Sequence, residues 1–302
     1  MPELPDIVVY IESLERRVLN QALEGVRLAS PFVVRSVDPP ISILTGRRVL
    51  ELRRLGKQIV FAFEDQLFLV LHLMIAGRLH WKARRAALPG KAGLAAFDFP
   101  EGALILTEAG SKKRASIHVV KGATDLKAFD RGALEVLDST PDAFGKALAG
   151  ENHTLKRALT DPRIFSGIGN AYSDEILHKA RLSPMKLTSK LSEAEVHALW
   201  SAARDVLSQW VERLRAQTGA EFPAKVTAFR PEMAVHGRYL KPCPDCGAPV
   251  QRIVYAENEC NYCAQCQTGG RLLADRALSR LLKEDWPRSL DEMEKHFESR
   301  RV

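Results

Sequence analysis

The chain has 302 residues, with 44 Lys or Arg against 37 Asp or Glu, a net charge of +7 and a pI near 9.2. This length allows a sizeable core and two or three domains, and the basic excess fits either a polyanionic partner or an ordinary basic surface. The most apolar run, residues 67–77, is too short to span a bilayer, and no secretory signal is recognisable. We therefore expect an intracellular, cytoplasmic protein without a membrane partner, whose five cysteines are metal ligands or free thiols rather than disulfides.

The first helix is predicted to begin within MPELPD, residues 1–6. Apolar residues recur behind it at helical spacing: Ile7, Ile11, Leu14 and Val18. The prolines, Glu3 and Asp6 suit an ordinary helix start. They also suit catalysis, because removal of Met1 would give Pro2 a free amine whose ammonium form the helix dipole disfavours. Glu3 is then the nearest carboxyl able to move protons, so both interpretations stand at this point.

The rest of residues 1–132 is rich in short apolar segments separated by turns, which predicts an antiparallel β-sandwich. The expected strands are 47–54, 58–64, 67–74, 94–99, 103–107 and 115–120. Residues 133–153 are expected to form a linker with one short helix.

From residue 154 the pattern becomes helical. Ser192 and Glu195 predict a capping box ahead of a long helix with one buried face. Before it, FSGIGN at 165–170 leads into another helix. The exposed N–H groups of such a turn can hold a phosphate, although a plain loop-to-helix turn fits equally well.

Two CxxC pairs lie sixteen residues apart: Cys243, Cys246, Cys263 and Cys266. Four thiolates at this spacing suit one structural Zn²⁺ ion, with a β-hairpin between the two pairs. Cys260 and Cys263 are also two residues apart and form a second possible pair. We favour Cys263 and Cys266 because CPDC and CAQC match each other. Two amphipathic tail helices are predicted, at 271–286 and from Ser289, where Glu292 completes a second capping box.

The motifs MPELPD, LGKQIVFAF, HLMIAGRL, GIGNAYSDEIL and VHGR and the four-cysteine segment occur in this order along the chain. With them the chain resembles the formamidopyrimidine-DNA glycosylase and endonuclease VIII family over residues 1–268. The resemblance implies an α+β multidomain fold. Its parts are an N-terminal β-sandwich with a leading helix (1–132), a linker (133–153), a helix–two-turn–helix DNA-binding domain (154–235) and a zinc finger (236–268). Residues 269–302 extend past the usual end as a helical extension that could bind a further partner.

The resemblance also implies a base-excision-repair DNA glycosylase with abasic-site lyase activity. Its partner would be double-stranded DNA containing damaged bases or abasic sites, and we expect a nucleoid-associated monomer. Pro2 would attack C1′ of a nucleotide flipped out of the stack, and Glu3 would protonate the sugar or base. Lys57 would contact the flanking phosphate and assist elimination; without MPELPD it would be an ordinary solvated lysine at a strand end.

Eight further residues are expected to bind DNA: Asn170, Arg114, Ile75, Lys112, Lys113, Lys156, Arg238 and Asn258. Asn170 would bind a backbone phosphate. Ile75 and Arg114 occupy the positions whose side chains fill the space left by the flipped nucleotide. Lys112 and Lys113 fit either phosphate contacts or an ordinary basic turn.

Two departures from the family pattern bear on the reaction. Asn258 stands where the family carries an arginine that assists δ-elimination, and asparagine supplies neither charge nor a forked contact. We therefore expect mainly β-elimination. The loop at 220–233 is shorter than the one that encloses 8-oxoguanine in some members, so formamidopyrimidines, hydantoins, oxidised pyrimidines and abasic sites all stay open as substrates.

The alternative function is that of a catalytically weak damaged-DNA or abasic-site binding protein of the same fold. The retained Pro2, Glu3 and Lys57 argue against it, because a pure binding protein has no need of an amine beside a carboxyl. RNA binding is disfavoured, because the basic motifs lack interleaved stacking aromatics.

Overall fold

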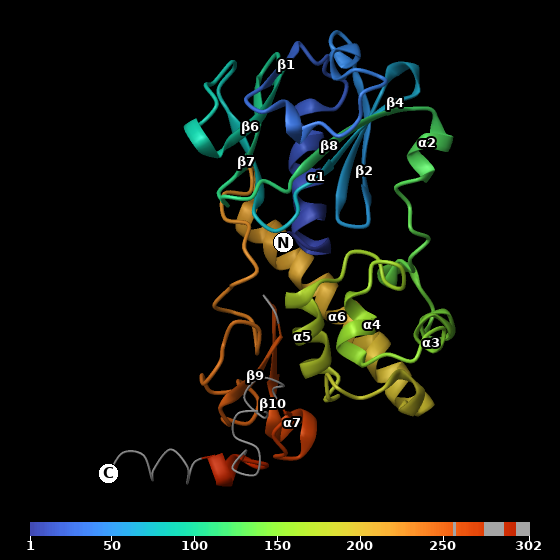
Figure 1. The fold of residues 1–302 in the computed structure, drawn as a ribbon, viewed down its shortest axis with the longest axis vertical. Coiled ribbons are helices and arrows are strands. Elements are labelled where there is room, and N and C mark those ends of the chain that lie inside the picture. The colour runs from blue at the N-terminus through green and yellow to red at the C-terminus, as the bar shows by residue number, and fades with distance from the viewer. Residues whose placement is uncertain (256–257, 275–286, 294–302) are drawn as a thin grey trace. The chain divides into compact units, whose positions relative to one another are not determined.

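The computed structural model describes residues 1–255, 258–274 and 287–293. The chain divides into two compact units (Figure 1). Unit 1 comprises residues 1–133 and 209–227, and unit 2 comprises residues 134–208 and 228–302. Among the described helices, none combines the length and the apolar character that crossing a membrane requires.

Unit 1 is a β-sandwich of two antiparallel four-stranded sheets, which confirms the predicted architecture. One sheet has the order β2 (Val49–Leu55), β3 (Gln58–Phe63), β4 (Leu67–His72) and β8 (Ser116–Lys121). The other has the order β1 (Gly25–Leu28), β6 (Gly93–Phe99), β7 (Gly102–Glu108) and β5 (Gly77–Lys82). All the predicted strands are present, whereas β1 and β5 were not predicted.

Helix α1 (Leu4–Val18) packs its apolar stripe into the sandwich core and lies against β2 (Figure 1). The short helix α2 (Ala123–Lys127) follows β8. Glu3 is the N-cap of α1, and its backbone N–H donates to the Asp6 carboxylate at 3.0 Å. This bond fixes the backbone of the residue that follows Pro2.

Unit 2 combines helices with a β-hairpin. Its elements are α3 (Pro141–Ala149), α4 (Leu155–Thr160), α5 (Asn170–Lys179), the first part of α6 (Glu193–Thr218), β9 (Val250–Tyr255), β10 (Asn258–Cys263) and α7 (Ala264–Thr268). The predicted capping box of α6 is present: the Ser192 N–H donates to the Glu195 carboxylate at 3.0 Å, and the Glu195 N–H donates to Ser192 Oγ at 3.3 Å.

Short 3₁₀ turns complete the described secondary structure, at Pro31–Val33, Ile41–Leu44, Glu64–Gln66, Gly90–Ala92, Val136–Asp138 and Thr188–Lys190. The tail helix expected at 271–286 lies outside the described residues from 275 onward, as do residues 294–302. Of the second predicted capping box, half is present. The Glu292 N–H donates to Ser289 Oγ at 3.2 Å, but the Glu292 carboxylate accepts from the Arg288 N–H.

Candidate functional site

The start of α1 gathers charged groups around the N-terminal amine. Met1 is half-buried, and Pro2 and Glu3 are buried. Burial lowers the pKa of the Met1 α-amine below its usual 8.0, and the cations of Arg78 and Lys57 lower it further, against the opposing effect of nearby carboxylates. A larger fraction of this amine is therefore unprotonated near neutral pH than in an exposed chain end.

The two cations near this amine, Lys57 and Arg78, both belong to unit 1. Lys57 lies in the two-residue turn between β2 and β3, where Gly56 adopts a positive φ of 62°. Arg78 lies in β5, and its guanidinium donates to the carbonyls of Val226 at 2.5 Å and Gly77 at 2.7 Å. Sequence reasoning missed Arg78, although the quoted motif HLMIAGRL contains it.

His72 is a second residue for which no role was predicted from the sequence. It ends β4 and lies opposite Gln58, the neighbour of Lys57. Burial first, and then the charge of Lys57, lower the pKa of His72 to about 4, so its ring is neutral at pH 7. Among the described residues, neither His72 Nδ1 nor Gln58 Oε1 has a hydrogen-bond partner. Two polar atoms beside Lys57 can therefore still form a hydrogen bond.

Ile75 lies at the turn between β4 and β5 and is 54% exposed, as a side chain that enters a DNA stack requires. The Gly77 N–H closes this turn by donating to the Leu73 carbonyl at 2.9 Å. A Cβ at Gly77 would lie 2.2 Å from that carbonyl oxygen, so the tight turn requires glycine.

The loop at 109–115 is held by one buried acid, Glu108. Its carboxylate accepts from the backbone N–H groups of Arg114 at 2.8 Å and Ala115 at 3.0 Å. The Lys113 ammonium donates to the Glu108 carbonyl. The backbone of the loop is therefore fixed while the Arg114 side chain stays exposed.

The same loop approaches the turn that carries Ile75. A Cβ built on Gly110 would lie 4.0 Å from the Ala76 Cβ. Lys112 is exposed here as well. The two residues predicted to fill the space of a flipped nucleotide, Ile75 and Arg114, are thus carried by neighbouring loops of unit 1.

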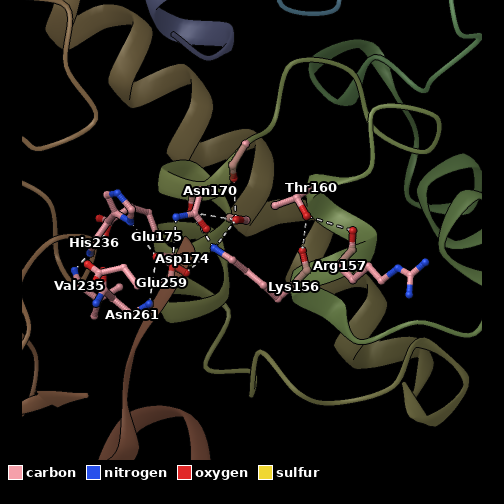
Figure 2. Close-up of polar contacts among 12 residues, drawn as sticks. Lys156, Arg157, Thr160, Asn170, Asp174, Glu175, Val235, His236, Glu259 and Asn261 are labelled. Carbon is pink, nitrogen blue, oxygen red and sulfur yellow. Dashed lines mark hydrogen bonds and ion pairs between the residues drawn. The ribbon is translucent and has the colours of Figure 1, made fainter. Parts of the chain in front are cut away.

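In unit 2, Asp174 is the centre of a buried polar network (Figure 2). Its carboxylate accepts from Lys156 Nζ at 2.6 Å, from His236 Nδ1 at 2.8 Å and from the Asn261 backbone N–H at 3.1 Å. Three segments far apart in sequence thereby meet on α5. Asp174 has no exposed surface, so these bonds replace the hydration that its charge loses.

Glu175, the next residue of α5, holds the segment that contains VHGR. Its carboxylate accepts from the backbone N–H groups of Ala234 at 2.7 Å, Val235 at 2.9 Å and His236 at 2.9 Å (Figure 2). In this segment Arg238 donates to the carbonyls of Pro231 at 3.0 Å and Pro242 at 3.2 Å.

Lys156 lies inside unit 2 rather than on its surface, with 4% of the residue exposed. Its ammonium donates to Asp174, to the Asn170 carbonyl at 2.7 Å and to Ser173 Oγ at 2.8 Å. An ammonium has three N–H donors, and each has a protein acceptor here. The geometry gives Lys156 a role in organising the first turn of α5.

Asn170 is the first residue of α5, after Gly167 with φ 79° and the N-cap Gly169. Its side-chain amide donates to the Glu259 carbonyl at 2.8 Å. An amide NH₂ has two donors, so one remains for a ligand oxygen. Asn258 begins β10 and pairs with Tyr255 of β9.

The four favoured cysteines converge in unit 2, where their sulfur atoms all lie within 4.8 Å of one another. Cys243 Sγ lies 3.9 Å from Cys266 Sγ, and Cys246 Sγ lies 3.4 Å from Cys263 Sγ. Tetrahedral thiolates with metal–sulfur bonds of about 2.3 Å are separated by about 3.8 Å, which these sulfurs approach. Cys260 lies instead in the apolar cluster of the hairpin, outside this group of four sulfurs.

Comparison with known proteins shows which family models, relatives and solved structures this chain resembles. The model of the formamidopyrimidine-DNA glycosylase N-terminal domain matches residues 1–111, and that of the formamidopyrimidine-DNA glycosylase H2TH domain matches residues 135–221. The formamidopyrimidine-DNA glycosylase of Thermus thermophilus is 33% identical over 89% of this chain and 100% of its own length. An uncharacterized formamidopyrimidine-DNA glycosylase-like protein of Mycobacterium tuberculosis is 43% identical over 49% of this chain and 92% of its own. A crystal structure of Lactococcus lactis Fpg in complex with abasic-site-containing DNA has a TM-score of 0.78 and 25% identity, and covers 88% of this chain and 99% of that one.

Proposed function

Because the chain belongs to the formamidopyrimidine-DNA glycosylase family, we propose that it excises damaged bases from double-stranded DNA and then cleaves the strand at the abasic site. The observation that carries this proposal is the N-terminal amine. Burial and two cations lower the pKa of the Met1 amine, and removal of Met1 would leave the Pro2 amine next in sequence to the buried Glu3.

The proposed reaction begins after removal of Met1. The Pro2 nitrogen forms a bond to C1′ as the glycosidic bond breaks, and the base leaves with the bonding electron pair and takes up a proton. Glu3 supplies a proton to the departing base or to the sugar ring oxygen, and the proton that the Pro2 nitrogen loses after bonding to C1′ goes to the other of these two sites. Protonation of the ring oxygen opens the ring to an iminium. Loss of a C2′ proton then expels the 3′ phosphate by β-elimination, and water hydrolyses the iminium to regenerate the amine.

The DNA contacts of this proposal divide between the two units. Ile75 and Arg114 enter the space of the flipped nucleotide, with Lys112 and Lys113 on phosphates. Asn170 and Arg238 bind the backbone from unit 2. Lys57 contacts the phosphate next to the lesion. Since Asn258 carries no charge, the strand product is mainly that of β-elimination.

We also propose that Cys243, Cys246, Cys263 and Cys266 bind one Zn²⁺ ion. The donor set supports this assignment, because four thiolates favour zinc and the sulfur separations fit a tetrahedron. Bound zinc would hold the two ends of the β9–β10 hairpin together. Burial raises the pKa of Cys263 to about 11, so a cation is required to keep that sulfur deprotonated near pH 7.

Borohydride trapping tests the amine chemistry directly. The protein is incubated with duplexes that carry an abasic site, 8-oxoguanine, a formamidopyrimidine or an oxidised pyrimidine, and the reduced covalent adduct is resolved on a denaturing gel. We expect an adduct with the unmodified chain and slower adduct formation with Pro2→Gly. We also expect less base release with Glu3→Gln. An intact-mass measurement establishes loss of Met1. Salt-sensitive binding without any adduct would instead favour the damaged-DNA binding protein.

A further inference from the structure

His178 reaches the cysteine cluster from the C-terminal turn of α5. Its Nε2 lies 3.3 Å from Cys243 Sγ, and its side chain is 4% exposed. The Asp245 carboxylate has its Oδ2 at 3.9 Å from the same nitrogen, and Cys266 Sγ lies within 4.8 Å of both side chains. A buried imidazole therefore lies in hydrogen-bond range of one of the four clustered sulfurs.

The direction of this contact follows from the state of the sulfur. A metal-bound cysteine is a thiolate, which can accept a hydrogen bond but has no proton to donate. The contact can therefore form in the metal-loaded protein only when His178 Nε2 carries hydrogen. The four sulfurs already complete a tetrahedron, so the imidazole adds a hydrogen bond to one ligand rather than a fifth bond to the metal.

Further bonds hold α5 and the cysteine module in this arrangement. The Arg181 guanidinium, just after the end of α5, lies 2.9 Å from the carboxylate of Asp245, which stands between the first two cysteines in the sequence. The Gln267 amide donates to the Leu182 carbonyl at 2.8 Å, while its oxygen accepts from the Cys263 N–H at 2.8 Å. His178 is thus placed by contacts on both sides of the cluster.

We propose that His178 is a positioning residue of the metal site, which donates a hydrogen bond to the Cys243 thiolate and so slows release of the ion. This inference rests on the proposed zinc site. A hydrogen bond from His178 holds the Cys243 side chain in the orientation that the metal requires. Removal of such outer partners typically lowers metal affinity about 10- to 100-fold.

The same helix also carries the turn proposed to bind phosphate. Asn170 begins α5 and His178 lies in its last turn, so both ends of one ten-residue helix are bonded to the cysteine module.

Zinc release from the full-length protein tests the proposal. His178→Phe keeps a ring of similar shape but has no N–H, whereas His178→Gln keeps an N–H donor. Each protein is loaded with one zinc, its metal content is measured, and release to excess EDTA is followed with a chromogenic zinc indicator. We expect release from His178→Phe to be about 10- to 100-fold faster than from the unmodified chain, with His178→Gln closer to the unmodified chain.

The measured metal content distinguishes failure of the proposed zinc site from failure of the role proposed for His178. If the unmodified chain binds no zinc, the proposed zinc site itself fails. If it binds one zinc and His178→Phe releases it at the unmodified rate, only the role of His178 is overturned. Cobalt substitution adds a spectroscopic check, because a tetrathiolate spectrum unchanged by His178→Phe excludes direct ligation, and a changed ligand field would overturn the proposal.

The tautomer of His178 can also be read without any variant, which covers the case in which His178→Phe does not fold. Nitrogen-15 NMR of the zinc-loaded protein distinguishes an imidazole protonated on Nε2 from one protonated on Nδ1. Hydrogen on Nε2 supports the donated bond. Hydrogen on Nδ1 alone contradicts it.

Discussion

Asn170 donates its side-chain amide to the backbone carbonyl of Glu259 at 2.8 Å, which joins the first residue of α5 to β10. Two residues further along β10, the Asn261 N–H donates to Asp174 on the same helix. Cys263, at the end of that strand, is one of the four cysteines proposed to bind zinc. The turn proposed to bind phosphate, the buried acid and the cysteine site are therefore linked through one strand.

Replacement of Asn170 by alanine removes both the bond to Glu259 and the donor proposed for phosphate. We expect DNA affinity to fall about 10- to 100-fold, since a hydrogen bond to a charged oxygen contributes about 1.5–3 kcal/mol. The salt dependence of binding should stay the same, because no charge is lost. A titration of an abasic-site duplex at several salt concentrations measures both quantities. Gln265→Ala, an exposed amide of the same unit, is the matched control.

Lys156→Met separates a structural lysine from a phosphate contact. It leaves the buried Asp174 carboxylate without its ammonium partner, and breaking a buried pair in this way costs about 3–5 kcal/mol of unfolding free energy. We expect a large loss in urea-unfolding stability, reduced in the double variant with Asp174→Asn. The exposed Lys179→Met should have little effect on stability.

The salt dependence of DNA binding then tests the role assigned to Lys156. Loss of a phosphate contact lowers the slope of log K against log salt by about one, whereas loss of an internal pair does not. A slope lowered by one in a folded Lys156→Met protein would return this lysine to the DNA surface.

Sequence alone predicted the features that depend on local pattern. Strands such as β3 and β4 are continuous apolar runs, and the CxxC spacing is a property of neighbouring residues, so both were recognised. Strand β1 escaped because it has four residues and none of them is buried. Strand β5 starts at a glycine and alternates buried with half-buried positions around polar side chains.

The roles of the charged residues in the two units could not be predicted from local sequence pattern. Lys156, Asp174 and His236 meet from three distant segments, and in a sequence each looks like a solvated residue. Arg78 acts on the N-terminal amine only because β5 folds back beside the start of α1. The spacing of these residues in the sequence does not indicate that they meet in space, so their roles could be assigned only from the structure.

Arg78→Met tests the electrostatic setting of the amine. Arg78 lowers the pKa of the Met1 amine, and we expect its charge to act in the same direction on the Pro2 amine left when Met1 is removed. Without this charge the pKa of that amine rises, and its unprotonated fraction at a given pH falls. We expect the acidic limb of the pH profile for adduct formation to move to higher pH. Arg78→Lys retains the charge and should keep the profile close to that of the unmodified chain. Trapping rates on an abasic duplex between pH 5 and 9 measure the shift, and identical profiles for both variants would contradict this role.

Ile75→Ala tests the side chain proposed to support the flipped nucleotide. Unstacking a base step costs a few kcal/mol, so loss of part of the wedge should slow excision of a damaged base about tenfold. Cleavage of a preformed abasic site should change less, because no base has to leave the stack. Stability should shift by no more than about 0.5 kcal/mol, since Ile75 is 54% exposed. Leu50→Ala, at 53% exposure, is the control for loss of an exposed apolar side chain.

Asn258→Arg places a cation on the first residue of β10. A guanidinium can form two charged hydrogen bonds to one phosphate, and it can stabilise the negative charge that develops as a second phosphate leaves. We therefore expect the share of δ-elimination product to rise, as measured with an end-labelled abasic strand whose 3′-aldehyde and 3′-phosphate ends separate on a gel. Asn258→Gln lengthens the side chain without charge and should leave the product at β-elimination. If the unmodified chain already gives mainly δ-product, another group supplies that charge and the explanation based on Asn258 is wrong.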